Sequence, residues 1–439
     1  DFSAVSPEIQ GASGLTSAFS LGLGDLDSNG FLDIIAGNMM YLNPGGVNAG
    51  KFDDVEPKPF ADLQSDVKSV TVADIDMDGD KDVVFATSHA VRIYHNPTGS
   101  MDRYFQGSVF FAGVNPIVLT AGYETVMPRT VLLADLNADG KADLIVGMGA
   151  GEESQYYINP GDGSFTSAST VAFGGIATDT RSVFVTDLNG DGIMDIVVGN
   201  AGAANEAYIG SLTGSTYTTA TSPIVLGAET DATYSIGVGD MDLDGVMDIV
   251  AGNYQQTNKV YLGKLAGTTY SVKGPGSGLG SEMKVPDVDG NLIGSTDATR
   301  SLVVADSDGD GFLDVLLANT GSQNRVYYGD GTGGFKGAGA IGNTQDDTFT
   351  LMSGDLNNDG NLDVAVANMG AGTEVTLGVS VVTPFDMSAV LEKRLQLQGL
   401  DFAGQGNEAG NNPAPEMTGL DIIVGEPTYS NPTTNFDGK

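Results

Sequence analysis

One acidic pattern of nine residues recurs seven times along this chain, and it constrains the fold more than any other feature. In each copy Asp occupies positions i and i+8, Asp or Asn occupies i+2 and i+4, and Gly occupies i+5. The first copy reads Asp25-Leu-Asp27-Ser-Asn29-Gly30-Phe-Leu-Asp33. The others begin at Asp74, Asp135, Asp187, Asp240, Asp306 and Asp355, at spacings of 49 to 66 residues. A recurring period of this length is typical of a repeat architecture.

Short runs of β-forming residues flank the acidic copies. Val183-Phe-Val185 precedes the fourth copy, and Ile196-Val-Val198 follows it. An aromatic residue about 21 positions past most copy starts, such as Tyr208, marks a third strand. A Gly-rich turn and a weaker fourth strand come next. Four short strands in each repeat of about 50 residues predict an all-β fold, a β-propeller of four-stranded blades.

The number of blades depends on how the C-terminal segment is interpreted. Leu420-Asp421-Ile-Ile-Val-Gly425 copies the strand that follows an acidic copy, and residues 402–419 replace the copy itself. We therefore predict one propeller over residues 1–439, with eight blades of which seven have intact loops. Residues 1–18 then supply a closing outer strand, and residues 386–439 form the degenerate last blade. The alternative is seven blades followed by a C-terminal appendage.

The acidic loops have the composition of a site for a hard cation. Ca²⁺ takes six to eight oxygen ligands, and alternating Asp and Asn side chains in a tight loop supply them. Gly at i+5 permits the sharp turn. An EF-hand is excluded, because it needs an acid at its twelfth position and flanking helices. Turn chemistry alone also favours Asp, Asn and Gly, but it does not explain seven copies with fixed acid spacing.

We therefore predict about seven Ca²⁺ sites, because converging carboxylates repel one another without a cation. The ligands are the side chains at i, i+2, i+4 and i+8 and the backbone carbonyl at i+6. In loop order the candidates are Asp25, Asp27, Asn29, Phe31, Asp33, Asp74, Asp76, Asp78, Asp80, Asp82, Asp135, Asn137, Asp139, Lys141, Asp143, Asp187, Asn189, Asp191, Ile193, Asp195, Asp240, Asp242, Asp244, Val246, Asp248, Asp306, Asp308, Asp310, Phe312, Asp314, Asp355, Asn357, Asp359, Asn361 and Asp363.

The loops also account for much of the net charge of −38, which comes from 57 acidic and 19 basic residues. Of the acids, 24 occupy side-chain ligand positions. This balance excludes a nucleic-acid binder that works by neutralising phosphates, and it argues against docking on anionic lipid. No apolar run of about 18 residues is present, so we expect no direct membrane insertion. The chain has no Cys and hence no thiolate metal site.

Hairpin geometry predicts a second functional surface. Each loop joins the first two strands of a blade, so all loops share one rim and the opposite strand ends share the other axial face. That face gathers the starts of first strands and the ends of second strands. Its candidate ligand-binding residues are Lys68, Arg129, Arg181, Tyr234, Arg300, Asn200, Asn253 and Asn319, with Phe349, Asn38 and Asn368 at equivalent positions. We predict a protein or polysaccharide partner there. In the structural alternative, these residues join neighbouring blades.

The repeats resemble a known family. The loops, together with strands such as Asp314-Val-Leu-Leu-Ala-Asn319, resemble FG-GAP/VCBS repeats, the propeller modules also found in integrin α chains. Thr180-Arg-Ser-Val183 before a loop, and Asn324-Arg-Val-Tyr327 after one, resemble the bacterial type. The resemblance implies a calcium-binding propeller. Its members serve in adhesion, carbohydrate binding, surface assembly and occasionally polysaccharide cleavage, so the fold alone does not decide the function.

Our prediction is a non-catalytic binding, adhesion or surface-assembly module. It is extracytoplasmic, because such loops need calcium at about 10⁻⁴–10⁻³ M. The alternatives are a lectin and a calcium-dependent polysaccharide lyase. A lectin with no Trp would have to use some of the 15 Tyr residues. Among the two histidines, His89 and His95, the pair Tyr94–His95 is the most lyase-like, although a histidine in a strand is more often structural.

Overall fold

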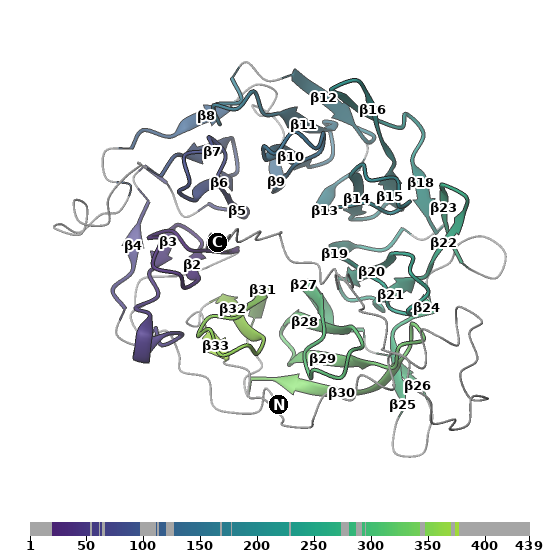
Figure 1. Ribbon diagram of the computed structural model, residues 1–439. Coiled ribbons are helices and arrows are strands. Elements are labelled where there is room, and N and C mark those ends of the chain that lie inside the picture. Colours follow the sequence, from purple (N-terminus) through teal and green to yellow (C-terminus); the bar gives the residue numbers. More distant parts are fainter. Residues whose placement is uncertain are drawn as a thin grey trace, which may run out of the picture.

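The computed structural model of this chain is a ring of antiparallel sheets (Figure 1). It describes residues 20–376, apart from 53–54, 61, 64–65, 97–110, 112–113, 120–126, 167–168, 177, 228–229, 274–280, 287–291, 295, 343–346 and 370–373. The predicted closing strand at 1–18 and the predicted last blade at 386–439, with its loop at 402–419, lie outside the described residues.

Within the described residues six sheets have four strands, and we number them blades 1 to 6 in chain order. Blade 1 comprises β1 (Leu21–Gly24), β2 (Asp33–Ala36), β3 (Met39–Tyr41) and β4 (Lys58–Pro59). Blade 2 comprises β5 (Ser69–Ala73), β6 (Asp82–Ala86), β7 (Val91–Tyr94) and β8 (Ile117–Leu119). Blade 3 comprises β9 (Pro128–Ala134), β10 (Asp143–Met148), β11 (Ser154–Ile158) and β12 (Ser169–Phe173). Blade 4 comprises β13 (Thr180–Thr186), β14 (Asp195–Asn200), β15 (Asn205–Tyr208) and β18 (Ile224–Leu226). Blade 5 comprises β19 (Thr233–Gly239), β20 (Asp248–Asn253), β21 (Lys259–Tyr261) and β24 (Ser281–Glu282). Blade 6 comprises β27 (Ala298–Ala305), β28 (Asp314–Thr320), β29 (Asn324–Gly329) and β30 (Phe335–Ile341).

Blade 7 follows, and its described part has three strands: β31 (Asp347–Gly354), β32 (Asp363–Met369) and β33 (Glu374–Thr376). Three further hairpins lie beside the blades: β16 (Gly210–Thr213) with β17 (Thr216–Thr219), β22 (Gly263–Ala266) with β23 (Thr269–Val272), and β25 (Lys284–Pro286) with β26 (Leu292–Gly294). The described helical structure is one 3-10 turn, η1 (Gly46–Asn48), so no described helix could cross a membrane. The predicted all-β propeller with four-stranded blades is confirmed.

The hydrophobic core is divided among the spaces between neighbouring blades. Second strands are apolar on both faces, because each is covered by a blade on either side. In β2, Ile34 and Ala36 pack toward blade 7, whereas Ile35 packs toward blade 2, and all three are fully buried. Burying a side chain of this size contributes about 1.5–3 kcal/mol. The core of the propeller is therefore a series of clusters between blades, as its repeats require.

The ring closes directly between blade 7 and blade 1 (Figure 1). Leu356 and Ala365 of blade 7 share one buried cluster with Leu21 and Ile34 of blade 1. Asn43 Nδ2 donates a hydrogen bond of 2.7 Å to the Leu356 carbonyl. The equivalent bonds run from Asn96 to Leu26 across blades 2 and 1, and from Asn159 to Ile75 across blades 3 and 2.

Blade 7 thus stands beside blade 1 as blade 1 stands beside blade 2. The prediction of eight blades is not confirmed, because direct packing between the first and seventh sheets leaves no space between them for another. The eighth blade was predicted from residues 386–439, which lie outside the described residues. The added hairpins lie in the segments that follow the acidic copies beginning at Asp187 and Asp240.

We predict that Asn43→Ala destabilises the ring by about 1–3 kcal/mol, because the buried Leu356 carbonyl loses its donor. The free energy of unfolding would be measured by urea denaturation. The control is Asn48→Ala, which changes an exposed residue of the 3-10 turn and should stay within about 0.5 kcal/mol of the parent. Equal stability of Asn43→Ala and the control would contradict this account of closure.

Candidate functional site

The acidic copies form loops at one rim of the propeller, between the first and second strands of each blade. We call them acidic loops 1 to 7, beginning at Asp25, Asp74, Asp135, Asp187, Asp240, Asp306 and Asp355. In loop 1 the Asp25 carboxylate accepts the backbone N–H of Asn29 at 2.9 Å and of Gly30 at 2.8 Å. The Asn29 side-chain oxygen accepts the N–H of Phe31. The conformation of the loop is therefore stabilised by hydrogen bonds from its own backbone amides to its Asp and Asn side chains.

Two positions of each loop adopt left-handed backbone conformations. Position i+5 was predicted to need glycine, and Gly30 has φ of 87°. Position i+3 is left-handed as well, which was not predicted from the sequence. It is occupied by Ser28, Met77, Ala138, Leu243 and Asn358, or by glycine in loops 4 and 6. A left-handed conformation costs a non-glycine residue about 1–2 kcal/mol, so the hydrogen bonds of the loop offset a local strain.

The last Asp of each loop is the first residue of the second strand and is fully buried. In loop 1, Asp33 Oδ2 accepts the Leu26 N–H at 2.7 Å, and Oδ1 accepts the Asn43 N–H at 2.6 Å. One carboxylate thereby joins its loop, its strand and the end of the third strand. Burial is the main cause that raises the pKa of this residue, to about 8 for Asp33.

The same position titrates high in other loops for the same reason. Burial raises the pKa of Asp143 and Asp195 to about 6, and that of Asp248 and Asp314 to about 7. Two backbone hydrogen bonds lower each value, and neighbouring carboxylates in the loop raise it. These carboxyls are consequently costly to ionise unless positive charge is brought close to them.

Several loops bring carboxylates close enough to share one cation. Ligand oxygens from three Asp residues lie within 4.8 Å of one another in loops 1, 2, 5 and 6. In loop 5, Asp240 Oδ1 is buried and has no hydrogen-bond donor. Loops 3, 4 and 7 have Asn at i+2, and its side-chain oxygen is directed into the loop as an acceptor. This all-oxygen donor set fits a hard divalent cation. The ligand assignment, including the i+6 carbonyls, stays a prediction.

Lysines from outside the loop reach two of these clusters. Lys273 Nζ, just after β23, lies 2.6 Å from Asp242 Oδ2 and 2.5 Å from Asp244 Oδ2 in loop 5. Lys336 of β30 pairs in the same manner with Asp308 and Asp310 of loop 6. In both loops, the carboxylates at i+2 and i+4 attract a cationic group from a neighbouring strand.

The opposite rim is shaped by a β-bulge at the start of five first strands. The register skips one residue where β9, β13, β19, β27 and β31 begin to pair with their second strands. The skipped residues are Arg129, Arg181, Tyr234, Arg300 and Phe349, which we call the axial cluster. A bulge changes the direction of a side chain relative to the sheet. These five positions were predicted to lie on the axial face from their place at the start of the first strand, whereas the bulge itself was not predicted.

Members of the axial cluster contact one another across blades. The Arg300 guanidinium carbon lies 4.6 Å from the ring centre of Tyr234, 4.1 Å from that of Tyr254 and 5.0 Å from that of Phe349. The Arg181 guanidinium carbon lies 4.9 Å from the ring centre of Tyr234 as well. These contacts extend over blades 4 to 7.

The arginines of the axial cluster differ in their charge partners. Asp179 pairs with Arg129 at 3.1 Å and with Arg181 at 2.5 Å. Within the described part of the chain, no carboxylate pairs with Arg300, which donates one long hydrogen bond to Thr320. Among the described residues, Arg300 is therefore a guanidinium held by aromatic rings, with no carboxylate to neutralise its charge.

The asparagines predicted at this face have a structural role instead. Asn200, Asn253 and Asn319 are buried, with 0–1% of their surface exposed. Each side-chain oxygen accepts a threonine hydroxyl from the first strand, and each amide donates to a backbone carbonyl four residues later. This corrects the prediction that they face a ligand. Lys68, outside the five bulges, already has an interaction partner.

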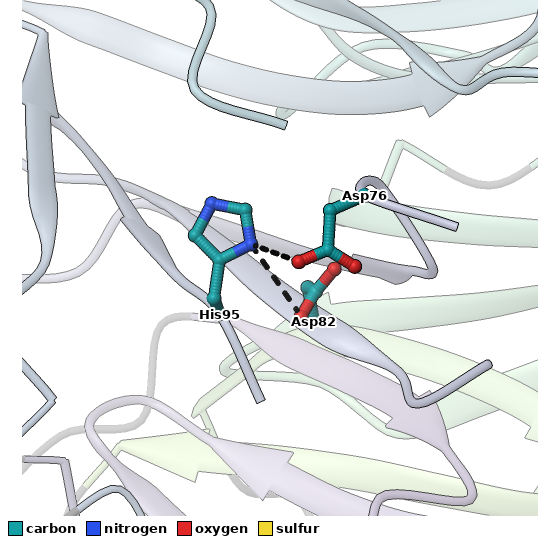
Figure 2. A group of neighbouring side chains, drawn as sticks. All are labelled: Asp76, Asp82 and His95. Atoms are coloured by element: carbon teal, nitrogen blue, oxygen red, sulfur yellow. Dashed lines mark hydrogen bonds and ion pairs between the residues drawn. The ribbon is translucent and has the colours of Figure 1, made fainter. Parts of the chain in front are cut away.

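The lyase-like pair is also separated by the fold. Tyr94 is fully buried, with its ring 5.4 Å from that of Phe60 and 5.7 Å from that of Phe85. His95 points instead toward acidic loop 2, where its Nδ1 lies 3.1 Å from Asp76 Oδ2 (Figure 2). The two side chains do not converge on one site, and neither belongs to the axial cluster.

Comparisons with known proteins agree with this architecture. A family model described as FG-GAP-like repeat matches residues 74–146, 135–198, 187–251, 240–317 and 306–366. No curated protein sequence matches the chain. A crystal structure of BBS1N in complex with ARL6DN, soaked with lead, is similar with a TM-score of 0.51 and 10% identity, over 83% of this chain and 94% of that chain.

Two further solved structures were also found. The same complex soaked with mercury has a TM-score of 0.51 and 10% identity, over 84% of this chain and 94% of that chain. A structure of an Agrocybe aegerita lectin, described as recognising non-reducing terminal N-acetylglucosamine, has a TM-score of 0.47 and 18% identity, over 75% and 81% of the two chains. At 10% identity the likeness to the BBS1N complex shows the fold alone.

The buried carboxyls predict an unusual pH dependence. The raised folded-state pKa values mean that the metal-free native protein binds more protons than the unfolded chain, whose Asp pKa is about 3.9. Stability in EDTA should therefore fall as pH rises from about 5 to about 8, through the folded-state pKa values. A saturating divalent cation should remove this fall. Thermal melting across that pH range, with and without cation, measures both; a melt independent of pH in EDTA would contradict the prediction.

Proposed function

This chain belongs to the FG-GAP-like repeat family, and we propose that it is a calcium-stabilised propeller that binds an anionic protein or polysaccharide surface without catalysing a reaction. The observation that carries the proposal is the axial cluster. Five successive blades use a bulge to direct Arg, Tyr or Phe at one rim, in a protein whose net charge is −38.

The calcium part of the proposal rests on the donor chemistry of the opposite rim. Its loops offer carboxylate and amide oxygens, and the orphaned Asp240 Oδ1 lacks a donor. Burial makes the last Asp of each loop costly to ionise, which a bound cation would reverse. Loops of this kind bind extracellular calcium at about 10⁻⁴–10⁻³ M. We therefore propose a secreted, cell-surface or otherwise extracytoplasmic location.

The binding part rests on the chemistry of Arg300 and its rings. A guanidinium fits carboxylate, phosphate or sulfate groups in a bidentate manner. Tyr234, Tyr254 and Phe349 hold that guanidinium in place, so little side-chain entropy is lost when a ligand binds. The same rings offer apolar surface to a sugar or to a protein side chain. An acidic group on either kind of partner could pair with the Arg300 guanidinium, because no carboxylate among the described residues neutralises that charge.

We predict that chelation lowers the melting temperature. A cation that binds only the native state adds about 2.7 kcal/mol per site at about 100 times its Kd. Melting in EDTA, and after calcium is restored, measures the effect. Asp240→Asn should reduce the calcium stoichiometry measured by calorimetry by one site. Asp162→Asn, an exposed turn residue outside the loops, is the control. A melt unchanged by EDTA would contradict the calcium proposal.

For the axial face, we predict that Arg300→Ala weakens ligand binding at least about tenfold, because one charge-assisted bond contributes about 1.5–3 kcal/mol. An array of uronate-containing, sulfated and neutral glycans would be probed with the calcium-loaded chain. The matched control is Arg325→Ala. Arg325 is an exposed arginine on the third strand of the same blade, and it pairs with Asp297. A silent array would direct the search to acidic protein partners.

Binding that survives both Arg300→Ala and Tyr234→Ala would remove the axial cluster from consideration. Release of unsaturated sugar ends from a uronate polymer would contradict the non-catalytic part of the proposal.

A further inference from the structure

Acidic loop 2 differs from the other loops by having a histidine at its edge. His95 follows β7 and directly precedes Asn96, whose N–H binds the buried Asp82 at 2.7 Å. The other five four-stranded blades have an equivalent residue, which is identified by the same strand register and the same hydrogen bond to the buried Asp. In each of them this residue is aliphatic or a tyrosine. These residues are Leu42, Ile158, Ile209, Leu262 and Tyr328.

The imidazole is directed at the carboxylates of the loop (Figure 2). His95 Nδ1 lies 3.1 Å from Asp76 Oδ2 and 3.9 Å from Asp82 Oδ1. One ligand atom from each of the three residues lies within 4.8 Å of the other two. Asp82 is fully buried, whereas about a quarter of each of the other two side chains is exposed, at 24% for His95 and 25% for Asp76. The cluster thus has one inner ligand and two that border solvent.

The neighbouring blade holds the ring in this position. Gly163, in the turn after β11, has φ of 60°. A Cβ added there would lie 2.5 Å from His95 Cε1 and 2.9 Å from Ile75 Cγ1. The ring therefore sits in a slot between loop 2 and the turn of blade 3. An imidazole confined in this way is preorganised to act as a ligand, since little rotamer freedom remains to be lost.

We propose that loop 2 binds a first-row transition ion of the Zn²⁺ class, with His95 Nδ1, Asp76 and Asp82 as protein ligands. Ca²⁺ takes oxygen ligands, whereas imidazole suits Zn²⁺, Ni²⁺ and Cu²⁺. Two donors at about 2.0–2.1 Å from a tetrahedral Zn²⁺ lie about 3.3 Å apart, close to the 3.1 Å between His95 Nδ1 and Asp76 Oδ2. The inference rests on the proposed cation-binding role of the loops and gives one of them a different metal.

The composition of the chain makes the test specific. It contains no Cys and two His residues, so a nitrogen-ligated ion has two candidate side chains, and His89 is exposed and outside the cluster. Tag-free full-length protein would be loaded with Ca²⁺ and titrated with Zn²⁺ by calorimetry and with Co²⁺ by visible absorption. We expect one tight Zn²⁺ per chain, a Co²⁺ d–d spectrum, and a single anomalous peak at the zinc edge beside His95 in crystals.

The decisive variant is His95→Leu, which installs the residue found at this position in blades 1 and 5 and should fold. We expect it to weaken Zn²⁺ binding at least about 100-fold, because loss of an outer-shell partner alone costs about 10- to 100-fold. It should also lose the Co²⁺ spectrum and leave Ca²⁺ binding by the other loops unchanged. His89→Leu is the matched control and should bind like the parent.

Equal zinc affinity in His95→Leu and the parent, or zinc distributed over several loops, would overturn the inference while leaving the calcium proposal in place. Calcium filling loop 2 in the presence of both ions, with the imidazole unligated, would overturn it too. If no loop binds either ion, the proposed function itself is wrong, and that result differs from all the others.

Discussion

The propeller depends on one buried carboxylate in each blade. The last Asp of an acidic loop begins the second strand, and in the six four-stranded blades its two oxygens accept amides from the loop and from the end of the third strand. A buried charge is tolerated only when it is hydrogen-bonded and compensated. The backbone supplies the hydrogen bonds, and a cation at the loop would supply the compensating charge. Fold stability and metal binding are consequently linked through the same atoms.

The neighbourhood of that carboxylate is completed in two different ways. In blades 1 to 3 an Asn after the third strand, such as Asn43, donates to the carbonyl that precedes the buried Asp. In blades 4 and 5 a Gly replaces it, because a Cβ at Gly210 would lie 2.1 Å from the Met194 carbonyl oxygen. The hydroxyls of Tyr217 and Tyr270, from the added hairpins, then donate to that carbonyl instead. The added hairpins therefore have a structural purpose at the loop rim.

The first and second strands of a blade shape both of its rims, and the two rims differ. At one end the chain closes into an acidic turn, and at the other the first strand gains an extra residue at the bulge. Equivalent repeats then diverge at single positions. Lys273 and Lys336 bring an ammonium to loops 5 and 6, and His95 brings an imidazole to loop 2. Seven similar loops therefore offer electrostatically different sites, which a shared motif does not show.

The sequence by itself determined the repeat, the strand order within a blade, the loop positions and the acids that converge there. These features are local, because fixed spacing within nine residues and strand-length apolar runs decide them. The tertiary structure decided how the ring closes, since the packing of blade 7 on blade 1 involves residues more than 300 positions apart. It also decided which axial residues are available. Asn319 and Arg300 lie at the same end of blade 6 on neighbouring strands, yet the Asn319 amide is engaged in hydrogen bonds within the blade, whereas the bulge places the Arg300 guanidinium among rings from the neighbouring blades.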